Sequence, residues 1–138
     1  MNKPSLVFSL LPEVFAICRL ESTAPLPDWA FRGNFWNVSR TSDELSVVCA
    51  EGQVPSGVKS EKGWRCFKVE GPLDLALVGI AAAITVPLAE AGINLFCMAT
   101  FDTDYFLVQS EKAAAAVAAL TASGHCTAHF TQIKSPSE

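Results

Sequence analysis

The chain has 138 residues and a mass of 14.8 kDa, which suits one ordinary domain or two very small ones. Half of the residues are hydrophobic and only 17% are charged, so the chain is not intrinsically disordered. Ten basic and fourteen acidic residues give a net charge of −4, and Lys and Arg form no cluster. This balance argues against a nucleic-acid-binding protein, which would need to neutralise phosphates.

The cysteines indicate a reducing compartment rather than a disulfide framework. Their number is odd, their spacing is wide and no Cys-x-x-Cys pair occurs. Each stands among apolar neighbours, where a free cysteine behaves as a small hydrophobic residue. We therefore expect a cytoplasmic protein. The five residues are Cys18, Cys49, Cys66, Cys97 and Cys126.

Two apolar stretches resemble targeting or membrane segments but do not qualify as either. Leu6–Leu11 is followed by Pro12 and Glu13 and by no convincing cleavage site, so we do not expect a signal peptide. The longest uncharged stretch, Leu75–Ala89, is too short to cross a bilayer and contains Pro87. It predicts a buried helix, and no membrane partner is expected.

The first half of the chain predicts strands with little helix. Val14–Leu20 reads as a strand, and residues 23–32, with two prolines, allow only a short helix. Residues 34–51 predict a strand, an acidic turn and a second strand. Residues 52–63, with Pro, Gly and three charges, predict a loop.

The second half predicts the order β-α-β-β-α-β. Trp64–Glu70 alternates as a strand does, whereas Leu75–Ala91 is long, rich in Ala and Leu, and ends before Gly92, as a helix does. Asp74 would cap this helix. The remaining predicted elements are strand 93–100, turn 101–104, strand 105–108, helix 111–121 and strand 126–133. Short strands with two helices on one sheet face predict a ferredoxin-like α+β arrangement.

A partial internal repeat links the two halves. Residues 34–51 align without gaps onto residues 94–111, an offset of 60, and both copies predict a strand, an acidic turn and a strand. We therefore predict two ferredoxin-like units in tandem, residues 1–63 and 64–134, the first with degenerate helices. The identical pairs are Asn34 with Asn94, Val48 with Val108, and Glu51 with Glu111.

Two turns are the candidate functional elements. Gly71–Asp74 precedes the predicted helix, whose first N–H groups would suit a carboxylate. Thr100–Asp104 carries Asp102 and Asp104, which could accept hydrogen bonds from an ammonium or guanidinium group or bind a divalent cation. In a β-α-β-β-α-β unit these turns are neighbours, so they would form a groove with a donor-rich wall and an acidic wall. That polarity matches a zwitterionic amino acid. Taken singly, each segment also reads as an ordinary structural turn.

Other candidate sites are weaker. His125 and His129 would lie roughly 13 Å apart on a strand, which is too far to share a metal ion, so we expect edge or surface histidines. No phosphate-binding loop or nucleophile motif occurs, and no base, nucleophile and metal set converges. A metal-assisted enzyme using Asp102 and Asp104 and a protein-interaction module with exposed sheet edges remain the alternatives to a ligand-binding protein.

Three segments carry a resemblance to a known family: Phe67–Ile80, Pro87–Asn94 and Thr100–Tyr105. Together they resemble tandem ACT-domain proteins, which are related to the ACT modules of aspartate kinases and to the cytosolic arginine sensor. Upstream, Ser39–Val48 looks like the matching part of a first ACT unit. No kinase domain accompanies these segments, so any output would pass to a separate partner.

The resemblance implies a non-catalytic regulatory module that binds an amino acid or related metabolite at a domain or subunit interface. It implies no cofactor, a homo-oligomer and a separate regulated protein. Gly71, Pro72, Leu73 and Asp74 match the first ligand-contacting loop of the family, and Asn94 matches a position beside the ligand. Thr100, Phe101 and Asp104 match the segment lining the arginine pocket, and Asp102 joins them from the analysis of the turn. Arg40 aligns with Thr100, so the first unit need not bind ligand.

Overall fold

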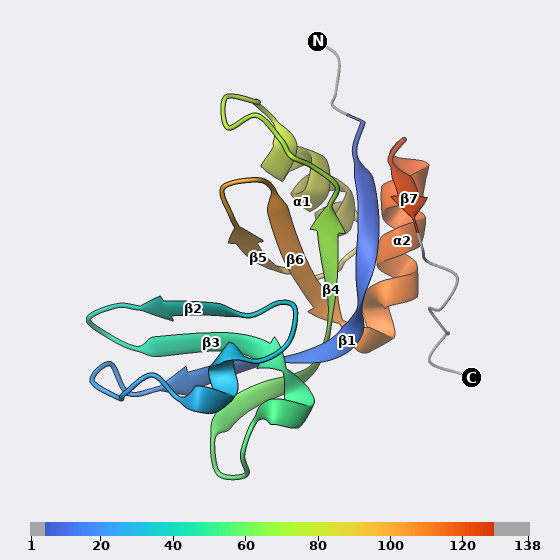
Figure 1. Cartoon of the computed structure of the whole chain (residues 1–138). Coiled ribbons are helices and arrows are strands. Elements are labelled where there is room, and N and C mark those ends of the chain that lie inside the picture. Colours follow the sequence, from blue (N-terminus) through green and yellow to red (C-terminus); the bar gives the residue numbers. More distant parts are fainter. Residues whose placement is uncertain (1–4, 129–138) are drawn as a thin grey trace. The chain divides into compact units, whose positions relative to one another are not determined.

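The computed structural model describes residues 5–128, and the chain divides into two compact units. One unit, called here the outer unit, consists of Met1–Pro12 and Arg65–Glu138. The other, the inserted unit, is Glu13–Trp64 and interrupts the outer unit along the chain. Strands β1 (Val7–Leu20) and β4 (Lys59–Val69) each contribute residues to both units, as the colours of Figure 1 allow the reader to follow.

The outer unit contains both α-helices of the described chain and a mainly antiparallel set of strands. Its strand order is β7-β1-β4-β6-β5. Besides the parts of β1 and β4, its elements are α1 (Ile80–Glu90), β5 (Phe96–Ala99), β6 (Asp104–Gln109), the 3-10 helix η3 (Ser110–Lys112), α2 (Ala113–Ala122) and β7 (Cys126–Ala128). The predicted succession of two helices among short strands is therefore present.

One strand of the outer unit differs from the prediction. A β-α-β-β-α-β unit would place β7 beside β4, but β1 lies between them, and β7 pairs parallel to β1 with Val7 opposite Cys126. The sequence predicted this strand only from Val14, after Pro12, a residue that cannot donate to a strand ladder. In the structure Pro12 lies inside the strand, at the boundary between the units. The end of the predicted last strand, residues 129–133, lies outside the described residues.

The inserted unit is built from strands and two single-turn helices. Its elements besides β1 and β4 are η1 (Asp28–Phe31), β2 (Asn37–Arg40), β3 (Leu45–Ala50) and η2 (Glu51–Gln53). Pro25 and Pro27 stand directly before η1 and restrict how far a helix can extend towards the N-terminus. The prediction of a loop over residues 52–63 is wrong at its C-terminal end, because β4 begins at Lys59.

The two hairpins match each other at an offset of 59, not 60. Strand β2 starts at residue 37 and β5 at 96, and β3 starts at 45 and β6 at 104. Both turns are closed by a threonine: Thr41 N–H donates to Glu44 O, and Thr100 N–H donates to Thr103 O, each at 2.9 Å. The structural counterpart of Thr100 is therefore Thr41, and Arg40 corresponds to Ala99. The ungapped sequence alignment was one residue out of register.

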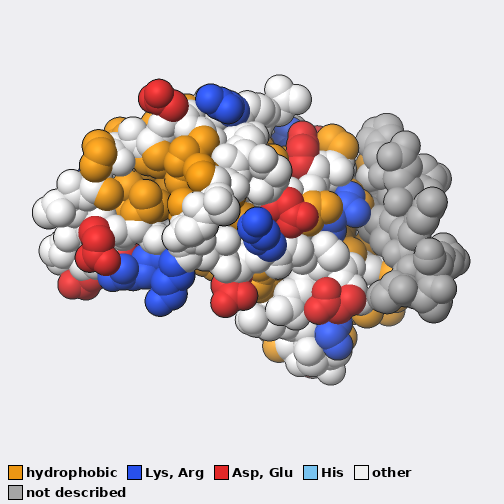
Figure 2. All heavy atoms as spheres, turned by 90° about the horizontal axis from the view of Figure 1, so that it is seen from below, with side chains coloured by type: hydrophobic (Ala, Val, Ile, Leu, Met, Phe, Trp, Pro, Cys, Tyr) orange, Lys and Arg blue, Asp and Glu red, His pale blue; other side chains and the backbone are white. Residues whose placement is uncertain are grey.

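Surface charges are mixed rather than gathered. On the face drawn in Figure 2, Lys and Arg side chains lie beside Asp and Glu, and hydrophobic side chains gather in one patch. Such a face offers no continuous basic track for a phosphate backbone.

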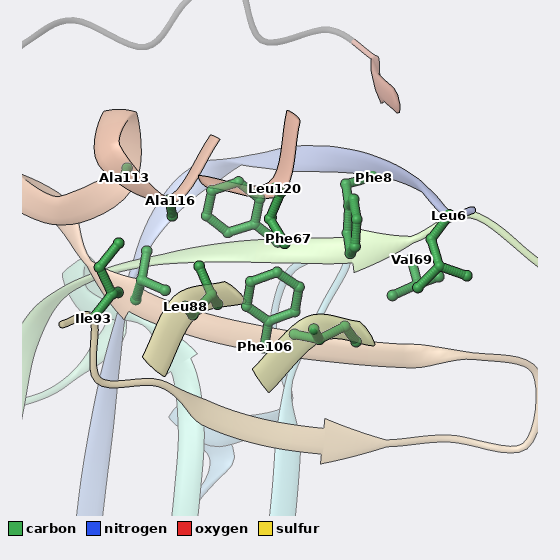
Figure 3. Close-up of a cluster of buried hydrophobic side chains, with 12 residues drawn as sticks. Leu6, Phe8, Phe67, Val69, Leu88, Ile93, Phe106, Ala113, Ala116 and Leu120 are labelled. Carbon is green, nitrogen blue, oxygen red and sulfur yellow. The ribbon is translucent and has the colours of Figure 1, made fainter. Parts of the chain in front are cut away.

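The core of the outer unit lies between the two helices and the strands (Figure 3). The rings of Phe67 and Phe106 stack at 5.0 Å, and Phe8 meets Phe106 edge-on at 5.7 Å. All three are fully buried, so Phe8 ties the first strand of the chain into a core whose other buried members, apart from Leu6, all lie at residue 67 or later. The inserted unit has a separate core, which includes Cys18, Leu45, Val47, Cys49 and Ala30 of η1.

Helix α1 is shorter than predicted and only partly buried. It begins at Ile80 rather than near Leu75, and its fully buried side chains are Ile84 and Leu88. The apolar residues 75–78 precede the helix and are exposed instead. None of the helices in residues 5–128 is both long enough and apolar enough to cross a membrane.

His125 corrects another prediction, because it is buried and not at the surface. Its side chain is 7% exposed and makes two hydrogen bonds at 3.1 Å. Leu6 N–H donates to Nδ1, and Nε2 bonds to Ala83 O, which fixes Nε2 as the protonated nitrogen. Ala83 O would ordinarily accept from residue 87, but Pro87 has no N–H. The imidazole thus satisfies the carbonyl that the helix proline leaves free.

Candidate functional site

The two predicted loops meet in the structure. Leu73 N–H donates to Asp102 O at 2.7 Å, and the Thr103 hydroxyl donates to Val69 O at 2.6 Å. A Cβ added to Gly71 would come within 3.1 Å of Asp102 O, so the approach requires glycine. The convergence expected from strand order is therefore present, because β4 and β6 are neighbours in the sheet.

Most polar groups of these loops are used within the loops. The Asp74 carboxylate accepts from Ala76 N–H at 2.8 Å and so stabilises a turn, not the start of a helix. The Thr100 hydroxyl donates to Thr103 O at 3.0 Å. Both Asp102 and Phe101 are exposed, and Phe101 is 79% exposed. Of the two residues in the predicted acidic wall, Asp102 is therefore exposed and Asp104 is half-buried.

The donor-rich end of α1 lies eight residues after the start of the predicted loop. Gly79 precedes the helix with φ of +90°, a left-handed conformation that favours glycine. No side chain caps this end, and the first turn holds no acidic residue. The first N–H groups of the helix have no acceptor within it, and no side chain of the first turn offsets the positive end of the helix dipole.

A pocket of about 220 Å³ lies between α1 and the β5–β6 hairpin. Its walls are mostly apolar, and all of them belong to the outer unit. The predicted turn residue Asp104 is part of the lining, which links the pocket to the two converging loops. The lining residues are Ala81, Ile84, Thr85, Cys97, Met98, Ala99, Asp104, Tyr105 and Phe106.

Strand alternation places Asp104 on the same face of the hairpin as the core. Asp104 stands opposite Ala99, and Phe106 stands opposite Cys97, so these four residues share one face. Phe106 is in the core beneath the helices, which identifies this as the helix-facing side. Asp104 is half-buried, and within residues 5–128 its carboxylate has no ion pair or hydrogen bond. A half-buried carboxylate without a partner can accept a cationic ligand group.

The pKa of the Cys97 thiol depends on the Asp104 carboxylate. Partial desolvation and the nearby Asp104 carboxylate both raise the pKa of the Cys97 thiol above its ordinary value, although the residue as a whole is exposed. Cys97 and Cys126 are exposed, whereas Cys18, Cys49 and Cys66 are buried. Since the thiolate is the reactive form, Cys97 should be labelled slowly near neutral pH and faster as the pH rises through its pKa.

A labelling experiment tests this arrangement. We expect Asp104→Asn to lower the pKa of the Cys97 thiol and to accelerate its alkylation at pH 8, as followed by mass spectrometry. Cys126 in the same sample is the internal control and should react at an unchanged rate. An unchanged Cys97 rate would show that Asp104 does not face the thiol.

The structure keeps one predicted residue apart from the others. Asn94 is exposed and follows the C-terminal end of α1, whereas the converging loops adjoin its N-terminal end. The helix has eleven residues, so its two ends are separated by about 16 Å. Asn94 and Asp104 therefore do not border the same end of the helix.

Sequence reasoning missed the helix wall of the pocket. Ala81, Ile84 and Thr85 are spaced as neighbours on one helix face, and this face lines the pocket. The usable signal is Gly79, which falls within the predicted helix Leu75–Ala91. A glycine eight residues after Gly71 instead ends the loop and starts the helix, which brings Ala81 into the first turn.

The inserted unit has no strand pair equivalent to Ala99 and Asp104, which line the pocket of the outer unit. At the offset of 59, Arg40 and Leu45 correspond to Ala99 and Asp104, and both pairs are strand partners. The Arg40 guanidinium donates to the carbonyls of Ser22 and Ala24, and Leu45 is fully buried in the core of the inserted unit. A long side chain and a core residue thus replace the small residue and the carboxylate of the outer unit.

Metal binding finds no support in the geometry. In the part of the chain that the structure describes, no three His, Cys, Asp or Glu side chains are grouped so that they could hold a metal ion. His129 lies outside these residues. The candidate site is a mostly apolar pocket that has one carboxylate in its lining and adjoins the first turn of α1.

Two family models match the chain, and their matched ranges roughly follow the inserted unit and the part of the outer unit that comes after it. A model described as the ACT domain matches residues 59–122, and a model of an N-terminal domain matches residues 13–57, inside the inserted unit. A search of curated proteins finds no match.

Solved structures that resemble the chain include the following three. Protein Atu0741 from Agobacterium tumefaciens is 35% identical with a TM-score of 0.87, covering 91% of this chain and 93% of that one. A Vibrio cholerae protein of unknown function, described as a possible transport protein, is 25% identical with a TM-score of 0.72, covering 87% and 91%. The regulatory subunit of aspartate kinase from Thermus flavus is 12% identical with a TM-score of 0.58, covering 89% and 99%, and shares the fold. The chain belongs to the family of protein Atu0741 and carries an ACT domain over residues 59–122.

Proposed function

We propose that this protein is a non-catalytic regulatory module that binds an amino acid in the outer unit. The observation that carries the proposal is the unpartnered, half-buried carboxylate of Asp104 in the wall of an apolar pocket. The pocket adjoins the first turn of α1, which supplies the opposite charge. An amino acid carries both complementary groups: an ammonium for Asp104 and a carboxylate for the helix N–H groups.

The ACT domain supports a regulatory role. The aspartate kinase regulatory subunit shares this fold, which is consistent with a module whose ligand shifts an equilibrium between states. Such a shift has a regulatory effect only if another subunit or another protein responds to it. We propose that the chain acts as a homo-oligomer or through a separate regulated protein, and that the inserted unit is a degenerate ACT-like unit related to the arginine-sensor type of tandem protein.

A calorimetric screen tests the proposal. Each of the twenty amino acids is titrated into the full chain, and at least one should bind and raise the midpoint of thermal unfolding. Asp104→Asn should weaken that binding by tenfold or more, since it removes the charge and keeps the shape. Absence of binding by all twenty would exclude an amino-acid sensor.

One observation favours an interaction module as the second candidate. The loop before α1 exposes Leu75, Leu77 and Val78, with Val78 87% exposed, and Phe101 is exposed in the turn that this loop contacts. Exposed apolar clusters often mark contacts with other proteins. If Val78→Asp abolishes the association of this chain with another protein, while Asp104→Ala has no effect on any measured property, the interaction role is the correct one.

A further inference from the structure

We infer that the ligand carries an apolar side chain, which occupies the pocket between α1 and the β5–β6 hairpin while its ammonium pairs with Asp104. This inference rests on the proposed function and specifies the class of amino acid. It also assigns roles to residues outside the converging loops, namely Ala81, Ile84 and Cys97.

The pocket has the size and chemistry for such a side chain. Its volume of about 220 Å³ exceeds the roughly 150 Å³ of an engineered apolar cavity that binds benzene. It therefore has room for the side chain of leucine, methionine or phenylalanine. Ile84 and Phe106 are buried at its base, and the Thr85 hydroxyl already donates to Ala81 O at 2.9 Å. The walls thus offer area for apolar contact and few groups for polar recognition.

A cationic side chain fits less well. Asp104 is the only charged residue in the lining, so it can neutralise one cation. If a guanidinium or a side-chain ammonium took Asp104, the α-ammonium would have no acidic partner in the pocket. An unpaired charge against apolar walls loses its hydration without compensation, which weakens binding. Pairing Asp104 with the α-ammonium leaves the apolar walls to the side chain.

The position of Asp104 relative to the helix supports this orientation. Asp104 and Ala99 lie at the turn end of the hairpin, and they share the pocket with Ala81 in the first turn of α1. Cys97, Ile84 and Thr85 lie one or more residues further along strand and helix. The polar end of the pocket is therefore at the helix start, and the apolar end extends along the helix.

Titration of the full chain tests the inference with leucine, methionine, phenylalanine, glycine, arginine and lysine as probes. We expect at least one of the three apolar amino acids to bind tenfold or more tightly than glycine, arginine and lysine. The stoichiometry should be one per chain, since the inserted unit carries Arg40 and Leu45 at the equivalent positions. Tighter binding of arginine or lysine would overturn the inference and leave the proposed function intact. If none of the twenty amino acids binds, the proposed function itself fails.

Two adjacent alanines provide a matched pair of variants. Ala81 and Ala82 are both exposed in the first turn of α1, but only Ala81 lines the pocket. Ala81→Leu should weaken binding of the best apolar ligand by tenfold or more, whereas Ala82→Leu should change it by less than twofold. Both variants should unfold within a few degrees of each other. Equal affinities in the two variants would show that the side chain does not enter this pocket.

Discussion

Replacing His125 by alanine should destabilise the protein by about 2–4 kcal/mol. The imidazole accepts from Leu6 N–H and donates to Ala83 O, and both bonds are in a buried or partly buried setting. Each backbone group left without a partner costs about 1–3 kcal/mol. The edge-on contact between the imidazole and Phe8 is lost as well. Denaturant unfolding followed by circular dichroism measures the loss, and a change below about 0.5 kcal/mol would contradict the assignment.

A second substitution isolates the bond to the helix. Pro87→Ala restores an N–H that can donate to Ala83 O, so the imidazole is no longer required there. His125→Ala should therefore cost about 1 kcal/mol less in the Pro87→Ala background than in the native chain. Thr121→Ala, on the exposed face of α2, is the control and should have little effect in either background. Strict additivity would show that His125 does not compensate for the proline.

Making the outer hairpin resemble the inserted one should abolish ligand binding. In the double variant Ala99→Arg/Asp104→Leu, the pocket loses its carboxylate and receives a long side chain at its polar end. Truncating one partner of a desolvated charge pair costs about 2–5 kcal/mol, and the arginine adds steric exclusion and charge repulsion. We expect affinity for leucine or phenylalanine, whichever binds tighter to the native chain, to fall by at least about 100-fold.

The single variants separate these effects. Ala99→Arg should exclude the ligand by volume, and Asp104→Leu should remove the ammonium partner without narrowing the pocket entrance. Calorimetry gives the affinities, and circular dichroism confirms that each variant is folded. Binding of the double variant within threefold of the native chain would show that the ligand lies elsewhere.

The sequence predicted those parts of the fold that rest on local pattern. Alternation and turn residues identified the β5–β6 hairpin, and strand order then brought Gly71 and Asp102 together. The helix start was wrong because Asp74 is as good a cap for a turn as for a helix, and only the backbone distinguishes the two uses.

Long-range pairing decided the features that the sequence did not predict. The strand from Val7 depends on β7 and β4, which are distant in sequence, and Pro12 concealed it. His125 and Ala83 are separated by 42 positions, so no local pattern could join them. Equally, Ala81 can be assigned to the pocket wall only when the start of α1 at Ile80 is known.

The interruption of the outer unit by the inserted one governs how the chain can be shortened and synthesised. A fragment that starts at residue 59, where the ACT-domain match begins, retains the helices but lacks the strand that lies between β7 and β4. Both flanking strands would then present unpaired edges, which favour aggregation. On the ribosome, the first strand emerges before any of its outer-unit partners, so its pairing with β7 must wait until residue 128 has been translated.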